Sequence, residues 1–202
     1  MTFILAEDAA IKAHLSGITV ADERSTSRAV KVWFGYPDVE IRTQDYPFIT
    51  IDLIGMREAT ERQTSGYVYD GDYIGTIAPT EDSRGNPTWY GYEIPVAYDL
   101  TYQITSYSRH PRHDRAILLQ LNQKFPGMRG HLAVPNQLGT SIAYRHMFLE
   151  STFKNDKAEG ENGNKRLLRN MYTVRVVSEL PLGVVDQLTA VNTVNTTLNQ
   201  TS

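Results

Sequence analysis

Residues 94–105, Ile-Pro-Val-Ala-Tyr-Asp-Leu-Thr-Tyr-Gln-Ile-Thr, carry the clearest strand pattern in the chain. Every second position holds an apolar side chain, namely Ile94, Val96, Tyr98, Leu100, Tyr102 and Ile104. Six matches to a period of two predict a β-strand with one apolar face. Because proline has no N–H to donate, Pro95 marks the start of this strand or a place on a sheet edge.

Further strands and two helices are predicted around this segment. Alternating apolar residues predict strands at 29–36, from Pro47 to Leu53, and at 166–177, with shorter strands near 131–134 and 146–153. Apolar residues at helical spacing predict helices at 3–15 and at about 112–125, the second ended by Pro126-Gly127. The polar stretches 21–28 and 155–164 predict loops. This order of elements predicts an α+β fold, with a mostly antiparallel sheet and two main helices.

We expect residues 1–181 to form a single domain, since 202 residues suffice for one core and no interior linker is evident. Within it, residues 58–92 hold six tyrosine and tryptophan residues among glycines, at Tyr67, Tyr69, Tyr73, Trp89, Tyr90 and Tyr92. A structureless loop of that length is unusual in a compact domain. The pattern therefore predicts a long aromatic hairpin, or extended arm, with short strands at 67–69 and 73–77 and a turn at 69–72.

Residues 182–202 follow Pro181 and predict a second arm. Their apolar side chains are spaced among threonine and asparagine, and Asp186 is the only charge. Such a segment has too much apolar surface for a disordered tail and too little to fold alone. We expect it to pack on a neighbouring subunit, through residues that include Val184, Val185 and Leu188.

Composition excludes several classes of protein. The net charge of -3 is not that of a dedicated nucleic-acid binder. The absence of cysteine removes disulfides, thiol nucleophiles and thiolate-bound zinc. Glu7 and Asp8 interrupt the N-terminal segment, so we expect no signal peptide there, and no stretch is apolar enough to predict a membrane span.

No pattern of catalytic or cofactor-binding residues is evident, so we expect no enzyme, no cofactor and no metal. The run from His110 to Asp114 has two histidines and an aspartate, but its spacing matches no standard metal site. It is better explained as the polar entry to the second helix. No nucleophile elbow or phosphate-binding loop occurs. Glu58 and Glu61 are more simply solvated surface charges than a catalytic pair.

Two groups of residues are candidates for a subunit interface. Arg57, Glu58, Glu61 and Arg62 mix both signs of charge where the chain leaves a strand, and opposite charges set the register of a contact. In the aromatic arm the candidates are Tyr67, Tyr69, Trp89 and Tyr90, because tyrosine and tryptophan dominate protein interfaces. Such side chains also stack on sugars, so an aromatic-rich carbohydrate-binding module remains an alternative.

The chain resembles the tail terminator or tail-completion proteins of tailed bacteriophages, a family of small neck proteins. The first helix, the strand Val30–Pro37 and the segment Tyr46-Pro47-Phe48-Ile49-Thr50-Ile51, similar to the family's YP-x-I-x-I strand, carry the resemblance. So do Glu61-Arg62-Gln63, the strand Pro95–Ile104, the helix ending Lys124-Phe125-Pro126-Gly127 and the closing strand Arg166–Val176. The likeness covers about residues 3–181.

The resemblance implies a structural virion protein, assembled in the bacterial cytoplasm, that forms a homohexameric ring at the head-proximal end of the tail. Such a ring ends polymerisation of the tail tube protein and joins the tail to the head–tail connector and neck proteins, while DNA passes through it without sequence-specific binding. The alternative within the same virion is a head-completion, neck or baseplate adaptor ring.

Overall fold

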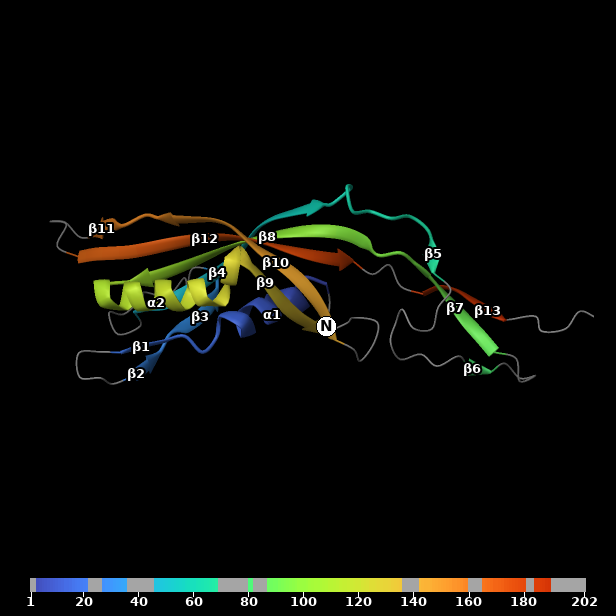
Figure 1. Ribbon diagram of the computed structural model, residues 1–202, viewed down its shortest axis with the longest axis horizontal. Coiled ribbons are helices and arrows are strands. Elements are labelled where there is room, and N and C mark those ends of the chain that lie inside the picture. The colour runs from blue at the N-terminus through green and yellow to red at the C-terminus, as the bar shows by residue number, and fades with distance from the viewer. Residues whose placement is uncertain are drawn as a thin grey trace, which may run out of the picture.

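In the computed structural model of the chain, the described residues are 3–21, 27–35, 46–68, 80–81, 87–135, 142–159, 165–180 and 184–189. Most of the described strands form one seven-stranded sheet (Figure 1). Its strands, in spatial order, are β3 (Lys31–Phe34), β4 (Phe48–Glu58), β8 (Val96–Ser108), β12 (Lys165–Leu180), β10 (Ile142–Lys154) and β9 (Arg129–Pro135). A seventh strand, β11 (Lys157–Glu159), pairs with β12. All pairs are antiparallel except β3 with β4, which confirms the predicted α+β class.

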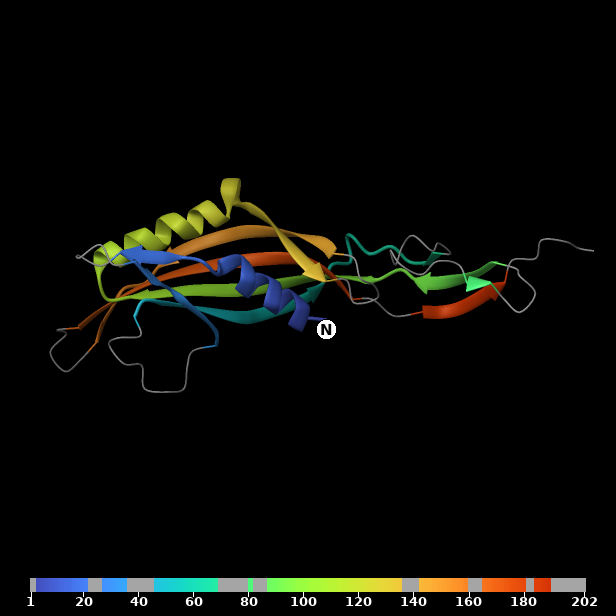
Figure 2. The ribbon, with the colours of Figure 1, turned by 90° about the horizontal axis from the view of Figure 1, so that it is seen from below.

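Both predicted helices pack on one face of this sheet, as the view from below shows (Figure 2). They are α1 (Leu5–Leu15) and α2 (Pro111–Lys124), and a short 3₁₀ turn, η3 (Pro126–Met128), follows α2. Gly127 in that turn has a φ of 62°, a left-handed conformation that glycine adopts without strain. The predicted end of the second helix at Pro126-Gly127 is therefore confirmed.

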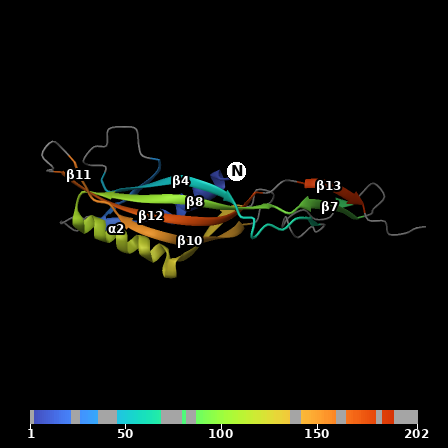
Figure 3. The same cartoon turned by 90° about the horizontal axis from the view of Figure 1, so that it is seen from above.

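The apolar row of the 94–105 segment forms the floor of the core. Leu100, Tyr102 and Ile104 are completely buried, and the register places Tyr102 between Leu53 of β4 and Val174 of β12. The helices cover this row with fully buried residues, namely Ala6, Ile11 and Leu15 from α1 and Ile117 and Leu121 from α2. The opposite sheet face carries no helix among the described residues, and Figure 3 looks onto it.

Several elements differ from the sequence-based expectation. Residues 21–28 were expected to form a loop, but β1 (Thr19–Ala21) and β2 (Ser27–Ala29) pair as a two-stranded antiparallel sheet. β4 continues beyond Leu53 to Glu58, so residue 58, where we expected the aromatic arm to begin, still pairs with Tyr98 in the main sheet. β11 lies within the expected loop 155–164.

The two predicted arms come together in a smaller sheet beyond one end of the main sheet (Figure 1). Its strands are β5 (Tyr67–Val68), β6 (Thr80–Glu81), β7 (Pro87–Glu93) and β13 (Val184–Thr189), and β7 pairs antiparallel with the other three. β13 was expected to pack on a neighbouring subunit; in the single chain it pairs with β7. The predicted short strand at 73–77 and the predicted turn at 69–72 both lie outside the described residues.

Candidate functional site

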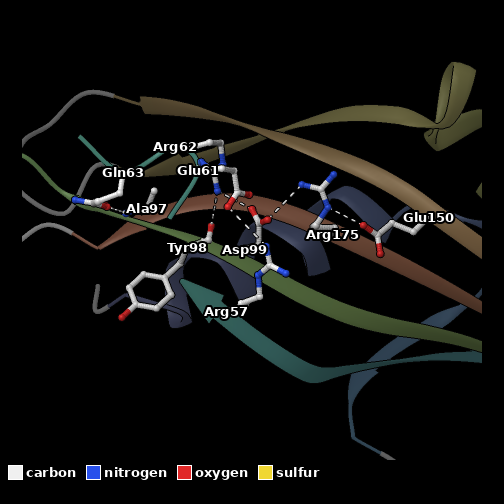
Figure 4. Close-up of polar contacts among 9 residues, drawn as sticks. All are labelled: Arg57, Glu61, Arg62, Gln63, Ala97, Tyr98, Asp99, Glu150 and Arg175. Atoms are coloured by element: carbon white, nitrogen blue, oxygen red, sulfur yellow. Dashed lines mark hydrogen bonds and ion pairs between the residues drawn. The ribbon is translucent and has the colours of Figure 1, made fainter. Parts of the chain in front are cut away.

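The helix-free face of the main sheet carries a cluster of six ionised side chains where it approaches the smaller sheet. We call the following set the charged cluster: Arg57, Glu61, Arg62, Asp99, Glu150 and Arg175. Its residues come from β4, β8, β12, β10 and the turn that follows β4 (Figure 4). Five of them, with Thr101, line a depression of about 390 Å³. Three positive and three negative charges leave the charged cluster neutral overall.

Asp99 is the centre of the charged cluster. It belongs to the polar row of β8, and its side chain is only 10% exposed. The Arg62 guanidinium donates to Asp99 Oδ1 at 2.6 Å and to the backbone oxygen of Tyr98 at 3.3 Å. Arg175 donates to Asp99 Oδ2 at 3.5 Å. A largely buried carboxylate with two guanidinium partners is strongly compensated, and short charge-assisted bonds are the stronger kind.

Arg175 extends the charged cluster across the sheet to β10. Its Nε donates to Glu150 Oε1 at 2.6 Å, and its guanidinium lies 4.8 Å from the centroid of the Phe148 ring. The β10–β12 register shifts between Leu149 and Ser151, at the position of Glu150. A bulge changes the direction in which the side chain of the extra residue points. Glu150 can therefore contact the same arginine as Phe148, two positions earlier in the strand.

The turn formed by residues 59–63 is tied to β8 by both backbone groups of Ala97. Ala59 N donates to Ala97 O at 2.8 Å, and Ala97 N donates to the Gln63 side-chain oxygen at 2.8 Å. Arg62, predicted as an interface residue, binds Asp99 of its own chain in this turn. This ion pair connects the turn to β8 at the point where the chain leaves the main sheet.

Arg57 and Glu61 remain available to a partner. Their ion pair spans 3.6 Å, and their side chains are 75% and 56% exposed. Pairs so exposed contribute little to the stability of a single chain. Glu58 is also exposed, opposite Tyr98 in the β4–β8 register. Their contact with another subunit stays a prediction.

Aromatic and histidine rings continue the helix-free face from the charged cluster to the far sheet edge. The rings of His131 on β9 and His146 on β10 lie 4.8 Å apart, and His146 lies 6.4 Å from Phe148. Phe153, further along β10, is 61% exposed. This alternation of exposed rings and compensated charges is the composition expected of a protein contact surface.

The remaining predicted interface residues lie in the smaller sheet, where the structure brings the two arms together. In the β7–β13 register Trp89 pairs with Leu188, Tyr90 with Gln187, and Val184 with Tyr92. Val185 falls at the register shift that follows Val184. Tyr67 pairs with Glu93 at the base of the arm, and Tyr69 lies outside the described residues.

The run from His110 to Asp114 forms the entry to α2, as predicted. His110 precedes the helix, Pro111 is its first residue, and the rings of His110 and His113 lie 5.3 Å apart. Asp114 is buried and accepts hydrogen bonds from Asn170 at 2.7 Å and Lys154 at 3.0 Å. Across the described part of the chain, no three histidine, aspartate or glutamate side chains are grouped so as to hold a metal ion.

The clearest shifted pKa values belong to the core beneath the helices. Burial raises the pKa of Asp8, which accepts a hydrogen bond from the Tyr102 hydroxyl at 2.8 Å, and burial with that bond also raises the pKa of Tyr102. Burial raises the pKa of Tyr172 to about 12, and the Asp114 carboxylate adds to the shift. These groups lie on the helix-covered side of the sheet and serve packing.

The chain is similar to a solved structure but matches no known sequence family. No family model matches the chain, and no curated protein matches it. One similar solved structure, from electron cryomicroscopy, is the PVC sheath/tube terminator of an extracellular contractile injection system in its extended state. The alignment has a TM-score of 0.45 and 17% sequence identity, and it covers 100% of this chain and 65% of that chain.

In the described residues, no helix is long and apolar enough to cross a membrane.

Proposed function

We propose that this chain is a structural subunit of a ring at the head-proximal end of a phage tail, where the ring ends growth of the tail tube. The observation that carries the proposal is the helix-free sheet face. This face carries the charged cluster, whose net charge is zero, next to a series of exposed rings. Among the described residues, it has no group of side chains arranged for catalysis. The sequence resemblance to tail terminators is a second, independent support.

The geometry suits a subunit that contacts copies of itself and the end of a tube. A ring requires two different surfaces on each copy, which meet head to tail and close. The helix-free face supplies one extended surface, and the smaller sheet at the end of the molecule supplies another (Figure 1). Arg57 and Glu61, exposed on that face, offer one charge of each sign to a neighbour, which favours a single register.

The task of such a ring is steric and electrostatic. One face of the ring binds the last ring of tail tube protein. The opposite face does not bind further tube subunits, so the tube stops growing, but it does bind the head–tail connector. The net charge of -3 fits a channel through which DNA passes without being held. We place the protein in the virion after assembly in the bacterial cytoplasm.

Light scattering of the purified chain over a range of concentrations tests ring formation. A discrete oligomer near six subunits is expected. A matched variant, Arg57→Glu with Glu61→Arg, exchanges the two exposed charges and keeps the net charge. It should retain the fold but weaken the oligomer if these charges contact a neighbour. A monomer at every concentration counts against a self-assembling ring.

Particle composition separates the proposal from its nearest alternative. Particles that lack the protein should have intact, DNA-filled heads and defective tails. Heads that leak DNA beside normal tails would instead assign the chain to head completion.

A glycan-binding signal that disappears with Trp89→Ala or Tyr90→Ala would favour the carbohydrate-binding alternative.

A further inference from the structure

One part of β4 has an open edge. β3 pairs only with Phe48–Ile51, whereas β4 continues to Glu58. On its other side, β4 pairs with β8 along nearly its whole length. Over Asp52–Glu58, no described strand covers the outer edge of β4. We call this segment the open edge. Its outward N–H and C=O groups form a template for an added strand.

The open edge is apolar in its middle and carries its charged residues, Asp52, Arg57 and Glu58, at its two ends. Its sequence, Asp-Leu-Ile-Gly-Met-Arg-Glu, contains neither lysine nor proline. Three of its side chains are apolar and exposed: Leu53 by 40%, Ile54 by 55% and Met56 by 52%. A bulge between Leu53 and Gly55 interrupts the β4–β8 register and leaves Ile54 unpaired. An apolar edge of this kind predicts a protein partner.

The topology points to the C-terminal segment of a second copy as that partner. β7 runs toward the main sheet, because only residues 94–95 separate it from β8. β13 is antiparallel to β7, so at its last residue, Thr189, it runs away from its own main sheet. The thirteen residues 190–202 span about 43 Å when extended. That reach and the direction of β13 at Thr189 favour a neighbouring molecule.

The sequence of residues 190–202 suits an added strand. It contains no charged side chain, and it is rich in threonine and valine, which favour strands. Val194, Thr196 and Leu198 alternate with polar residues and so share one face of an extended chain. An uncharged donor creates no repulsion with the mixed charges of Asp52, Arg57 and Glu58.

We propose that residues 190–202 of one copy add as a strand to the open edge, Asp52–Glu58, of a neighbouring copy. This inference rests on the proposed ring and names the contact that links its subunits. The contact is head to tail, since each copy gives a strand at one site and receives one at another, and such contacts close into rings.

The absence of cysteine from the chain makes disulfide mapping direct. Met56→Cys protein is mixed in turn with Val194→Cys, Thr196→Cys and Leu198→Cys proteins, and each mixture is oxidised mildly. A disulfide requires Cβ atoms about 3.8 Å apart. Three donor positions are used because the register of the added strand decides which of them lies that close to Met56. The control receiver is Leu119→Cys, which is 60% exposed and lies on α2 instead of on a strand edge.

At least one Met56→Cys mixture should form covalent dimers about a hundredfold faster than the Leu119→Cys mixtures, since an assembled contact holds groups at about millimolar effective concentration. Equal rates for both receivers, with the six-subunit oligomer intact, would overturn the strand exchange and leave the ring standing. Equal rates with no oligomer would overturn both. In the double variant Met56→Cys/Val194→Cys, an intrachain disulfide without dimers would assign the segment to its own chain and overturn exchange between copies.

Discussion

Removing the carboxylate of Asp99 should loosen the turn that connects the main sheet to the smaller sheet. Asp99→Ala deletes the acceptor of the 2.6 Å bond from Arg62 and the 3.5 Å contact with Arg175. A hydrogen bond to a charged group is worth about 1.5–3 kcal/mol. Both arginines are about one-third exposed, and water re-solvates them, so we expect a loss of about 1–2 kcal/mol in the free energy of unfolding.

The assay is a double-mutant cycle followed by denaturant unfolding. Asp99→Ala, Arg62→Ala and the double variant should show a coupling of about 1–2 kcal/mol, and each single change should lower Tm by about 2–8 °C. The control cycle uses the exposed pair Arg57 and Glu61, where a coupling of at most about 0.5 kcal/mol is expected. Hydrogen exchange gives a local readout, since Asp99→Ala should speed exchange of the Ala59 amide.

Equal couplings in the two cycles would refute this reasoning. They would mean that Arg62 and Asp99 interact no more strongly than two solvated surface charges. Unchanged exchange at Ala59 in Asp99→Ala would show that the backbone bonds to Ala97 hold the turn without help from the charged cluster.

Two further predictions concern the core. Because burial raises the pKa of Asp8, its protonated form favours the folded state, and that stabilisation is lost as pH rises above the usual value of 3.8 through the folded-state pKa. Asp8→Asn should therefore gain stability relative to the unmodified protein between pH 3.5 and pH 7 in denaturant unfolding, and a pH-independent difference would contradict the shift. Leu121→Ala removes a fully buried side chain and should cost about 2–5 kcal/mol, whereas Leu119→Ala, at a site 60% exposed, should stay within about 0.5 kcal/mol; similar costs would contradict the assigned helix face.

The elements with strong periodicity could be predicted from the sequence. The alternation at 94–105 marks the strand whose apolar row the helices cover, and the Pro126-Gly127 signal marks the end of α2. Each of these features is decided by neighbours in the sequence. The same patterns also predicted the fold class, because helical and strand periods differ clearly in these segments.

Long-range pairing could not be predicted in the same way. Nothing local indicates that Val184–Thr189 pairs with β7, or that β3 lies parallel to β4 in an otherwise antiparallel sheet. The bulge at Ile54 reverses which side chains face the core, so a period counted from Phe48 fails beyond it. β4 was consequently predicted to be too short.

The charged cluster was predicted only in part. The mixed charges of residues 57–62 marked one side of it, but Asp99, Glu150 and Arg175 were missed as its members. Asp99 stood out as the one acid in the polar row of its strand, which was the available signal. Its pairing with Arg62 depends on tertiary structure, because the two residues are 37 positions apart in the chain.

The length of tails made without the protein tests the central proposal most directly. The coding sequence is deleted from the genome that carries it, and tail lengths are measured by electron microscopy with and without the gene supplied in trans. The proposed function predicts tubes of uncontrolled length that fail to join heads, and a return to one length on complementation. Tails of normal, uniform length in the deletion would contradict it.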